Sequence, residues 1–124
     1  MLVKSRATGL EGLIEKSTNG VTVEVMTVTI VRIIYASFPP DQAEKARQNW
    51  KGKCAPLMIR QSGCMSEELL SCIDSPGEFM SYSEWDSMEN IQKYLQSGDH
   101  QEIKRQNRNI TGAQVVVKHY ELVS

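Results

Sequence analysis

The chain has 124 residues, of which 40% are hydrophobic and 23% are charged, and its formal net charge at pH 7 is −1. This length and composition are typical of one globular domain that buries a single core. A charge so close to zero gives no general attraction to nucleic acid or to an anionic membrane, so neither is expected as a partner. No apolar run reaches the ~18 residues of a membrane span and no signal peptide is recognisable, so we expect a cytoplasmic protein.

Cysteine usage points in the same direction. Cys54, Cys64 and Cys72 are odd in number and form no C-x-x-C pair, which argues against a disulfide framework or a zinc site and fits a reducing compartment. We expect Cys54 and Cys72 to be small packing residues. The basic cluster at residues 104–108 is expected to be a solvated helix face, because no aromatic residue interleaves it for base stacking.

Residues 1–25 are predicted to form an N-terminal extension, and residues 26–124 the main domain. The start of the extension is predicted as a short weak helix or a flexible arm, because Leu10, Leu13 and Ile14 have helical spacing but present a narrow apolar face. A turn is expected at residues 17–20. The next stretch, VTVEVMTVTIVRIIYASF, is dense in β-branched residues and too long for one strand. It either bends or begins with an extra strand at residues 21–25.

Pro39-Pro40 ends this strand, and apolar residues then recur at intervals of three and four. The pattern predicts an amphipathic helix over residues 40–60. Gly52 and Pro56 lie inside it, so a kink or break is expected near residues 54–56.

Residues 64–74 and 79–85 are predicted as two strands of a hairpin around the turn sequence DSPGE. On the second of these strands, alternation places Phe79, Ser81, Ser83 and Trp85 on one face. Asp86 and Asp99 each precede a glutamate by three residues, which predicts capping boxes that open two helices. The stretch AQVVVKHYELV is predicted as the last strand.

The predicted order of elements is β-α-β-β-α-β, an α+β ferredoxin-like arrangement with an antiparallel sheet. Right-handed crossovers place both helices on one face of the sheet. The other face carries valine and isoleucine, and a monomer rarely exposes an apolar surface of that size. We therefore expect a homodimer in which two sheets pack face to face.

Several short motifs are similar to those of antibiotic biosynthesis monooxygenase domains. They are SGC before the second strand, DSPGEF at the hairpin, SEWDSMENIQKYL from the third strand into the next helix, and SGDH after it. The resemblance extends from Met26 to Val123. It implies a dimeric α/β barrel, in agreement with the dimer expected above.

The family that the chain resembles contains cofactor-free oxygenases of electron-rich phenols and quinols, haem-degrading enzymes, signal-degrading enzymes and proteins of unknown activity, so fold alone assigns no reaction. Haem degraders share an asparagine on the first strand, a tryptophan on the third strand and a histidine in the following helix. Trp85 matches that pattern, but Arg32 and Lys104 stand near the other two positions. Haem degradation is therefore disfavoured.

Three residues are candidates for catalysis. Trp85 is expected to wall a pocket and stack on a flat substrate, with a plain core position as the alternative. His100 stands where the resemblance places a histidine after the second helix, and it titrates near neutral pH as a base should; the alternative is a residue at a helix start. Arg32 is the only charge between Val28 and Ile34. It holds either a substrate oxygen or an internal ion pair with Glu84 or Glu121.

Tyr82, Tyr35, Tyr94 and Phe79 are candidates for substrate binding, and the tyrosines could equally be core or interface residues. His119 is expected at the dimer face or at an edge of the sheet.

The favoured hypothesis is a small dimeric monooxygenase that oxidises an electron-rich aromatic, such as a quinol or polyketide phenol, with O2 and without any bound metal, flavin or other cofactor. The alternatives are a non-catalytic ligand-binding or stress-response module with the same pocket, and a partner-binding protein that uses residues 1–20 as its contact.

Overall fold

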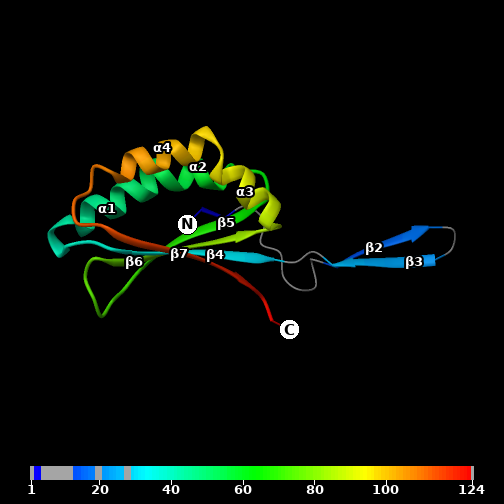
Figure 1. Ribbon diagram of the computed structural model, residues 1–124. Helices are drawn as coiled ribbons and strands as arrows, with labels where there is room; N and C mark the ends of the chain where they lie inside the picture. The colour runs from blue at the N-terminus through cyan, green and yellow to red at the C-terminus, as the bar shows by residue number, and fades with distance from the viewer. Residues whose placement is uncertain (1, 4–12, 19–20, 27–28, 124) are drawn as a thin grey trace.

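The computed structural model describes residues 2–3, 13–18, 21–26 and 29–123, and the side chains of the last range. Its body is a sheet covered on one face by helices (Figure 1). The strands are β1 (Leu2–Val3), β4 (Ile30–Ser37), β5 (Cys64–Ser71), β6 (Glu78–Trp85) and β7 (Gln114–Glu121), in the order β1-β5-β6-β4-β7. Every neighbouring pair is antiparallel. The predicted α+β ferredoxin-like class is confirmed.

The first crossover is helical from residue 40 to residue 59, but in four pieces. It comprises the 3-10 turn η1 (Pro40–Gln42), α1 (Ala43–Asn49), the π-helical segment η2 (Trp50–Cys54) and α2 (Ala55–Ile59). The predicted irregularity is thus present as a π-helical segment that ends just before Pro56. A proline has no N–H for the helical ladder, and a π segment is one way to accommodate that loss.

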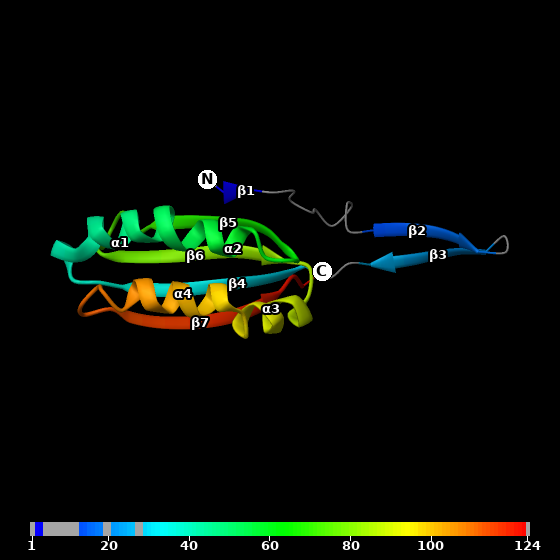
Figure 2. The ribbon, with the colours of Figure 1, turned by 90° about the horizontal axis from the view of Figure 1, so that it is seen from above.

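The second crossover contains α3 (Met88–Leu95) and α4 (Gly98–Asn107). Seen from above, α1 and α2 lie over the β5–β6 side of the sheet and α4 lies over the β4–β7 side (Figure 2). The main core lies between these layers and includes the fully buried residues Trp85, Met58, Ile91 and Cys54. No helix among the described residues is long and apolar enough to cross a membrane.

The N-terminal region contains a hairpin of β2 (Leu13–Thr18) and β3 (Val21–Met26), drawn apart from the sheet in Figures 1 and 2. The helix predicted around Leu13 and Ile14 is therefore wrong, because cross-strand pairing with β3 takes these residues. The alternative of an extra strand at residues 21–25 agrees with β3. Leu10 and the predicted turn residues 19–20 lie outside the described residues, and the domain boundary at residue 25 stays a prediction.

The β5–β6 hairpin forms as predicted. Gly77 in its turn has φ +95°, and an added Cβ would overlap the carbonyl oxygen of Phe38. Glycine is favoured there because it alone adopts positive φ without a steric penalty.

Candidate functional site

A cavity of about 250 Å³ lies between the sheet and the helices. The sheet and its flanking segments supply mostly apolar lining residues: Arg32, Ile34, Ala36 and Phe38 from β4 and its end, Leu69 from β5, Phe79 and Ser81 from β6, and Ala113, Val115 and Val117 from β7 and its start. The helical layer supplies Ala46, Trp50, His100, Ile103, Lys104 and Asn107. A concave apolar site with a few polar groups is the usual form of a small-molecule pocket.

Arg32 is the buried charge of this cavity. Its side chain is only 3% exposed, and its Nε and Nη1 atoms have no hydrogen-bond partner in the structure. Its guanidinium carbon lies 5.4 Å from the centre of the Tyr94 ring, a cation–π contact. Burial lowers the pKa of Arg32, but an arginine remains charged at neutral pH. A buried cation with two unpartnered nitrogens therefore lies at the wall of the cavity.

The internal ion pair considered for Arg32 does not form among the described residues. The strand register explains this for Glu84, because Glu84 pairs with Val31 and so belongs to the opposite face of the sheet from Arg32. Glu121 shares the face of Arg32 but pairs with Ile30, two residues away along β4. The sequence suggested both carboxylates because register and face are not readable from residue types alone.

His100 enters the cavity from the first turn of α4. The N-cap residue of this helix is Ser97, whose hydroxyl accepts a hydrogen bond from the His100 backbone N–H at 3.1 Å. The cap predicted at Asp99 is wrong, because its carboxylate is held instead by Arg60 at 2.7 Å and by Gln61 at 2.7 Å. In the same way, α3 is capped by Ser87 rather than by Asp86.

The hydrogen bonds of His100 fix its tautomer. Its Nδ1 lies 3.1 Å from the carbonyl oxygen of Leu95, and since a carbonyl only accepts, Nδ1 carries the proton. In the neutral ring Nε2 then has a free lone pair. The pKa of His100 is lowered chiefly by burial and also by the charges of Arg32 and Lys104, while the bond to Leu95 opposes the change. The neutral base is thus the main form at pH 7.

A buried carboxylate, that of Glu67, is hydrogen-bonded to two residues that line the cavity. Glu67 is 1% exposed, and its two oxygens accept hydrogen bonds from Trp50 Nε1 at 2.8 Å and Ser81 Oγ at 2.9 Å. Burial raises its pKa to about 7, against the opposing effects of these two bonds and of Arg32. In the strand register Glu67 pairs with Ser83, which in turn pairs with Arg32. Glu67 and Arg32 therefore share one row across the sheet.

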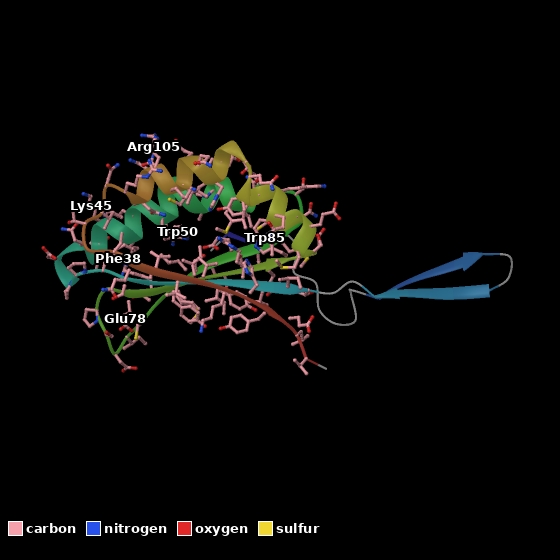
Figure 3. The ribbon with its side chains drawn as sticks, in the orientation of Figure 1. Phe38, Lys45, Trp50, Glu78, Trp85 and Arg105 are labelled. Atoms are coloured by element: carbon pink, nitrogen blue, oxygen red, sulfur yellow. The ribbon has the colours of Figure 1, made fainter. Side chains whose placement is uncertain are left out.

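Trp85 does not line this cavity. It is completely buried in the core, its indole N–H donates to Ser83 Oγ at 2.9 Å, and its ring lies 5.4 Å from that of Tyr94. Figure 3 shows Trp85 near α3, at the far end of the sheet from Phe38. Tyr94 is also buried and lies 5.0 Å from the His100 ring. The expected pocket wall is therefore a core residue, and Tyr94 separates it from the cavity residues.

The other candidates divide between the two faces of the sheet. Phe79 lines the cavity, as its alternation with Ser81 predicts. Tyr35 lies on the opposite face, where its hydroxyl is 3.1 Å from that of Tyr120, and Tyr82 belongs to that face by register. Neither is in reach of the cavity, since side chains alternate along a strand. His119 lies on the edge strand β7, in agreement with one of its two predicted positions. The other, the dimer face, is wrong, because His119 pairs with Arg32 on the helix-covered face.

Sequence reasoning missed five polar or aromatic contributors: Trp50, Glu67, Ser81, Lys104 and Asn107. Glu67 carried a usable signal, since it lies at an inward position of a strand whose neighbour Ser81 is also polar. Lys104 and Asn107 belong to the basic cluster, which is largely exposed as predicted but turns one edge toward the cavity. Within the described residues no three His, Cys, Asp or Glu side chains are grouped to hold a metal ion.

The family model described as antibiotic biosynthesis monooxygenase matches residues 29–106. This match covers more than half of the chain and includes Arg32, Glu67 and His100. The chain belongs to the antibiotic biosynthesis monooxygenase family. The resemblance seen in the sequence is therefore confirmed. No curated protein matches the chain.

Solved structures agree on the fold. A Bordetella bronchiseptica protein has a TM-score of 0.69 at 21% identity, over 78% of this chain and 99% of its own. One from Nitrosomonas europaea has a TM-score of 0.66 at 18% identity, over 77% and 99%. Both carry the name "putative antibiotic biosynthesis monooxygenase". A Bacteroides thetaiotaomicron protein of unknown function, named a "possible oxidoreductase", has a TM-score of 0.68 at 14% identity, over 77% and 99%. At these identities the likeness concerns the fold alone.

Proposed function

We propose that this protein is a cofactor-independent monooxygenase that oxidises a small electron-rich aromatic, a quinol or a polyketide-type phenol, with O2. The observation that carries the proposal is the cavity itself, in which a buried arginine with unused donors and a histidine with a free Nε2 share mostly apolar walls. At about 250 Å³ the cavity is below the ~300–1,000 Å³ of sites for drug-sized ligands. A ligand of one to three fused rings suits it.

The substrate itself supplies the electrons in this scheme. His100 Nε2 takes the proton of a phenol or enol, and the resulting anion, held at Arg32, is far more reducing toward O2 than the neutral molecule. The substrate loses two hydrogens, one from the hydroxyl and one from a ring carbon. That carbon gains one oxygen atom as a carbonyl, and the other oxygen atom leaves as water with the two hydrogens. The four electrons that reduce O2 all come from the substrate.

Each residue has a physical task in this scheme. The base removes a proton at neutral pH because its pKa is lowered and its Nδ1 proton is fixed by Leu95. Arg32 stabilises the developing negative charge as a preorganised donor in a site poor in water. Phe79 and the apolar walls hold the rings. Tyr94 contacts both Arg32 and His100 and positions them, with Trp85 packed behind it.

The alternative of a non-catalytic binding module predicts an apolar pocket in which Arg32 is held in an internal ion pair. The described residues provide no such pair for Arg32, and two of its nitrogens lack partners. This difference favours an oxygenase over a binding module.

We also propose that the protein acts as a homodimer through the free face of the sheet. Leu70, Val116 and Tyr120 on that face are 47%, 53% and 42% exposed. In the register Leu70 pairs with Met80, Met80 with Tyr35, and Tyr35 with Val116, so one largely apolar row runs across four strands. A face of this kind is usually covered by a partner.

Oxygen uptake tests the proposed reaction. Metal-stripped protein is incubated with a panel of quinols, anthrones and naphthols, and consumption of O2 is recorded above the spontaneous rate. We expect Arg32→Met and His100→Gln each to lower kcat by roughly 10²- to 10³-fold, since both remove groups that act on the reacting anion. Circular dichroism checks that each variant is folded.

Arg105→Met is the matched control for Arg32→Met. Arg105 is exposed, is paired with Glu102 and points away from the body (Figure 3), so its loss should leave uptake unchanged. Absence of uptake by the wild-type protein across the panel would reject the oxygenase and leave the binding module. Normal turnover by His100→Gln would remove His100 as the base.

A further inference from the structure

We propose that the cavity binds its ligand as a planar aromatic anion at Arg32, and that Glu67 takes up a proton from solvent when the anion binds. The inference concerns the same site as the proposed function and rests on it only for the aromatic character of the ligand. It assigns to Glu67 a role as the ionisable counter-charge of Arg32, a residue that the oxygenase scheme does not use.

The cavity offers a ligand few free hydrogen-bond donors from its inner wall. Trp50 and Ser81 both line it, but their N–H and O–H groups are already donated to Glu67. The ligand therefore meets the aromatic surface of Trp50, and the guanidinium at the same wall is that of Arg32, whose Nε and Nη1 have no partner. A buried cation with unpartnered N–H groups favours a ligand with negative charge, because charge-assisted hydrogen bonds are stronger than those to a neutral acceptor.

The charges of Glu67 and Arg32 act on each other across the sheet. They lie in the same row of the sheet, separated only by Ser83 on β6, and both are almost completely buried. Glu67 is the carboxylate whose charge acts on Arg32 when the cavity contains no anion. When an anion binds to Arg32, this compensation is no longer needed and the buried carboxylate is repelled by the ligand. Protonation of Glu67 removes that repulsion.

Protonation of Glu67 on ligand binding is expected near neutral pH. The pKa of Glu67 is raised by burial to about 7, with Arg32 among the effects that lower it. Neutralisation of Arg32 by a ligand raises it further. The charged or titratable groups around Glu67 come from every packed element described: Arg32 on β4, Lys51 and Cys54 on η2, Cys64 and Glu68 on β5, Tyr94 on α3, and His100 and Lys104 across the cavity.

Protons have a route to Glu67 that does not pass through the ligand. A second cavity of about 180 Å³ lies on the other side of Trp50, and Glu67 lines it together with Lys51 and Glu68, an exposed and a half-buried residue. Trp50 and Leu69 line both cavities and so separate them. Figure 3 shows Trp50 between the helices and the sheet. Proton uptake by Glu67 therefore remains open with the ligand in place.

Calorimetry with two matched probes tests the proposal without any turnover. The probes are 2-naphthoate, which is anionic throughout pH 6–8.5, and the neutral 2-naphthylmethanol. Titrations in buffers of different ionisation enthalpy give the number of protons taken up. We expect the wild-type protein to bind naphthoate at least tenfold more tightly than the alcohol at pH 6.5, and to take up roughly half a proton near pH 7. The naphthoate Kd should rise about tenfold from pH 6.5 to 8.5.

Two variants separate the parts of the proposal. Glu67→Gln should bind naphthoate with no proton uptake and with a Kd that stays flat over this pH range. Arg32→Met should lose the preference for naphthoate over the alcohol. If Glu67→Gln does not fold, Ser81→Ala serves instead: it removes one donor to the carboxylate, so the midpoint of proton uptake should move to higher pH.

Equal affinity of the wild-type protein for the two probes, absence of binding by both included, would overturn the proposal. Proton uptake unchanged in Glu67→Gln would also overturn it and would assign the proton to His100. Because neither probe is oxidised, anion binding with proton uptake stands even where the oxygen-uptake experiment fails. That combination would identify a binding module for aromatic anions.

Discussion

The two faces of the sheet invert the usual distribution of residues. The helix-covered face buries a carboxylate and a guanidinium, Glu67 at 1% and Arg32 at 3% exposure, whereas the free face exposes Val116 at 53% and Leu70 at 47%. Buried charges and exposed apolar rows both carry a cost in free energy. This inversion is the common basis of the two proposals made above, an anionic ligand on the covered face and a second copy of the chain on the free face.

A second contrast lies within the covered face. At the α3 end, Trp85 and its neighbours Ile91 and Tyr94 are fully packed, and at the other end Phe79 borders an open cavity. The same strand β6 therefore supplies both core and site. Packing stabilises the α3 end. The Phe79 end remains hollow because Ser81 and Ala36 have small side chains and Arg32 does not fill the space with apolar atoms.

The largest effect that would sharpen this contrast is expected from Trp85→Ala. Because the side chain is completely buried, its removal leaves a cavity and should lower the free energy of unfolding by about 3–5 kcal/mol, measured by chemical denaturation. Phe79→Ala removes an aromatic from the rim of an existing cavity and should cost less. A smaller loss for Trp85→Ala than for Phe79→Ala would contradict the assignment of core and site.

Val116→Lys tests the free face. A lysine there places a charge in the apolar row between two sheets, so we expect the dimer Kd to rise at least 100-fold, or about 3 kcal/mol. Sedimentation velocity measures the change. Ile73→Lys is the control, since Ile73 is 96% exposed and lies in the β5–β6 turn outside the strands. A wild-type protein that is monomeric at millimolar concentration would remove the dimer.

The smallest of these effects, and the one most dependent on pH, is expected for Glu67→Gln. The folded pKa of Glu67 is raised from 4.5 to about 7, chiefly by burial, so its favourable contribution is full below pH 4.5 and is lost as pH rises to about 7. Glutamine has no such loss. The stability of the variant relative to wild type should therefore increase by about 2–3 kcal/mol across that window.

Glu102→Gln provides the opposite sign for that measurement. The pKa of Glu102 is lowered to about 2 by hydrogen bonds from Arg105 and Gln106, so its contribution is present above the unfolded pKa and is lost as pH falls. Denaturant titrations from pH 2.5 to pH 8 should show the stability of Glu102→Gln relative to wild type rising as pH falls below 4.5, and that of Glu67→Gln rising as pH increases from 4.5 to about 7. Parallel slopes would mean that the unfolded state, not Glu67, sets the pH dependence.

Much of the fold could be predicted because local patterns were strong. Alternation on β6 separated Phe79 and Ser81 from Met80 and Tyr82, and the Pro-Gly turn fixed the β5–β6 hairpin. The helix caps were harder to predict. Asp99 and Ser97 are both good N-cap residues for α4, and Ser97 caps the helix because Arg60 holds the carboxylate of Asp99. Of the β2–β3 hairpin, only β3 was among the predicted alternatives. The helical spacing of three apolar residues is a weak signal, and pairing with a neighbouring strand overrides it.

The sequence by itself determined the order of elements, the face on which each strand residue lies and the family, since these follow from periodicity, turn chemistry and short motifs. Only the tertiary structure decided the site. In the structure, Trp85 lies in the core and Tyr35 lies on the free face. The residues that meet at or beside the cavity come from four different elements: Arg32, Glu67, Trp50 and His100. The reason is physical: burial and hydrogen bonding depend on neighbours that are distant along the chain, and no local pattern records them.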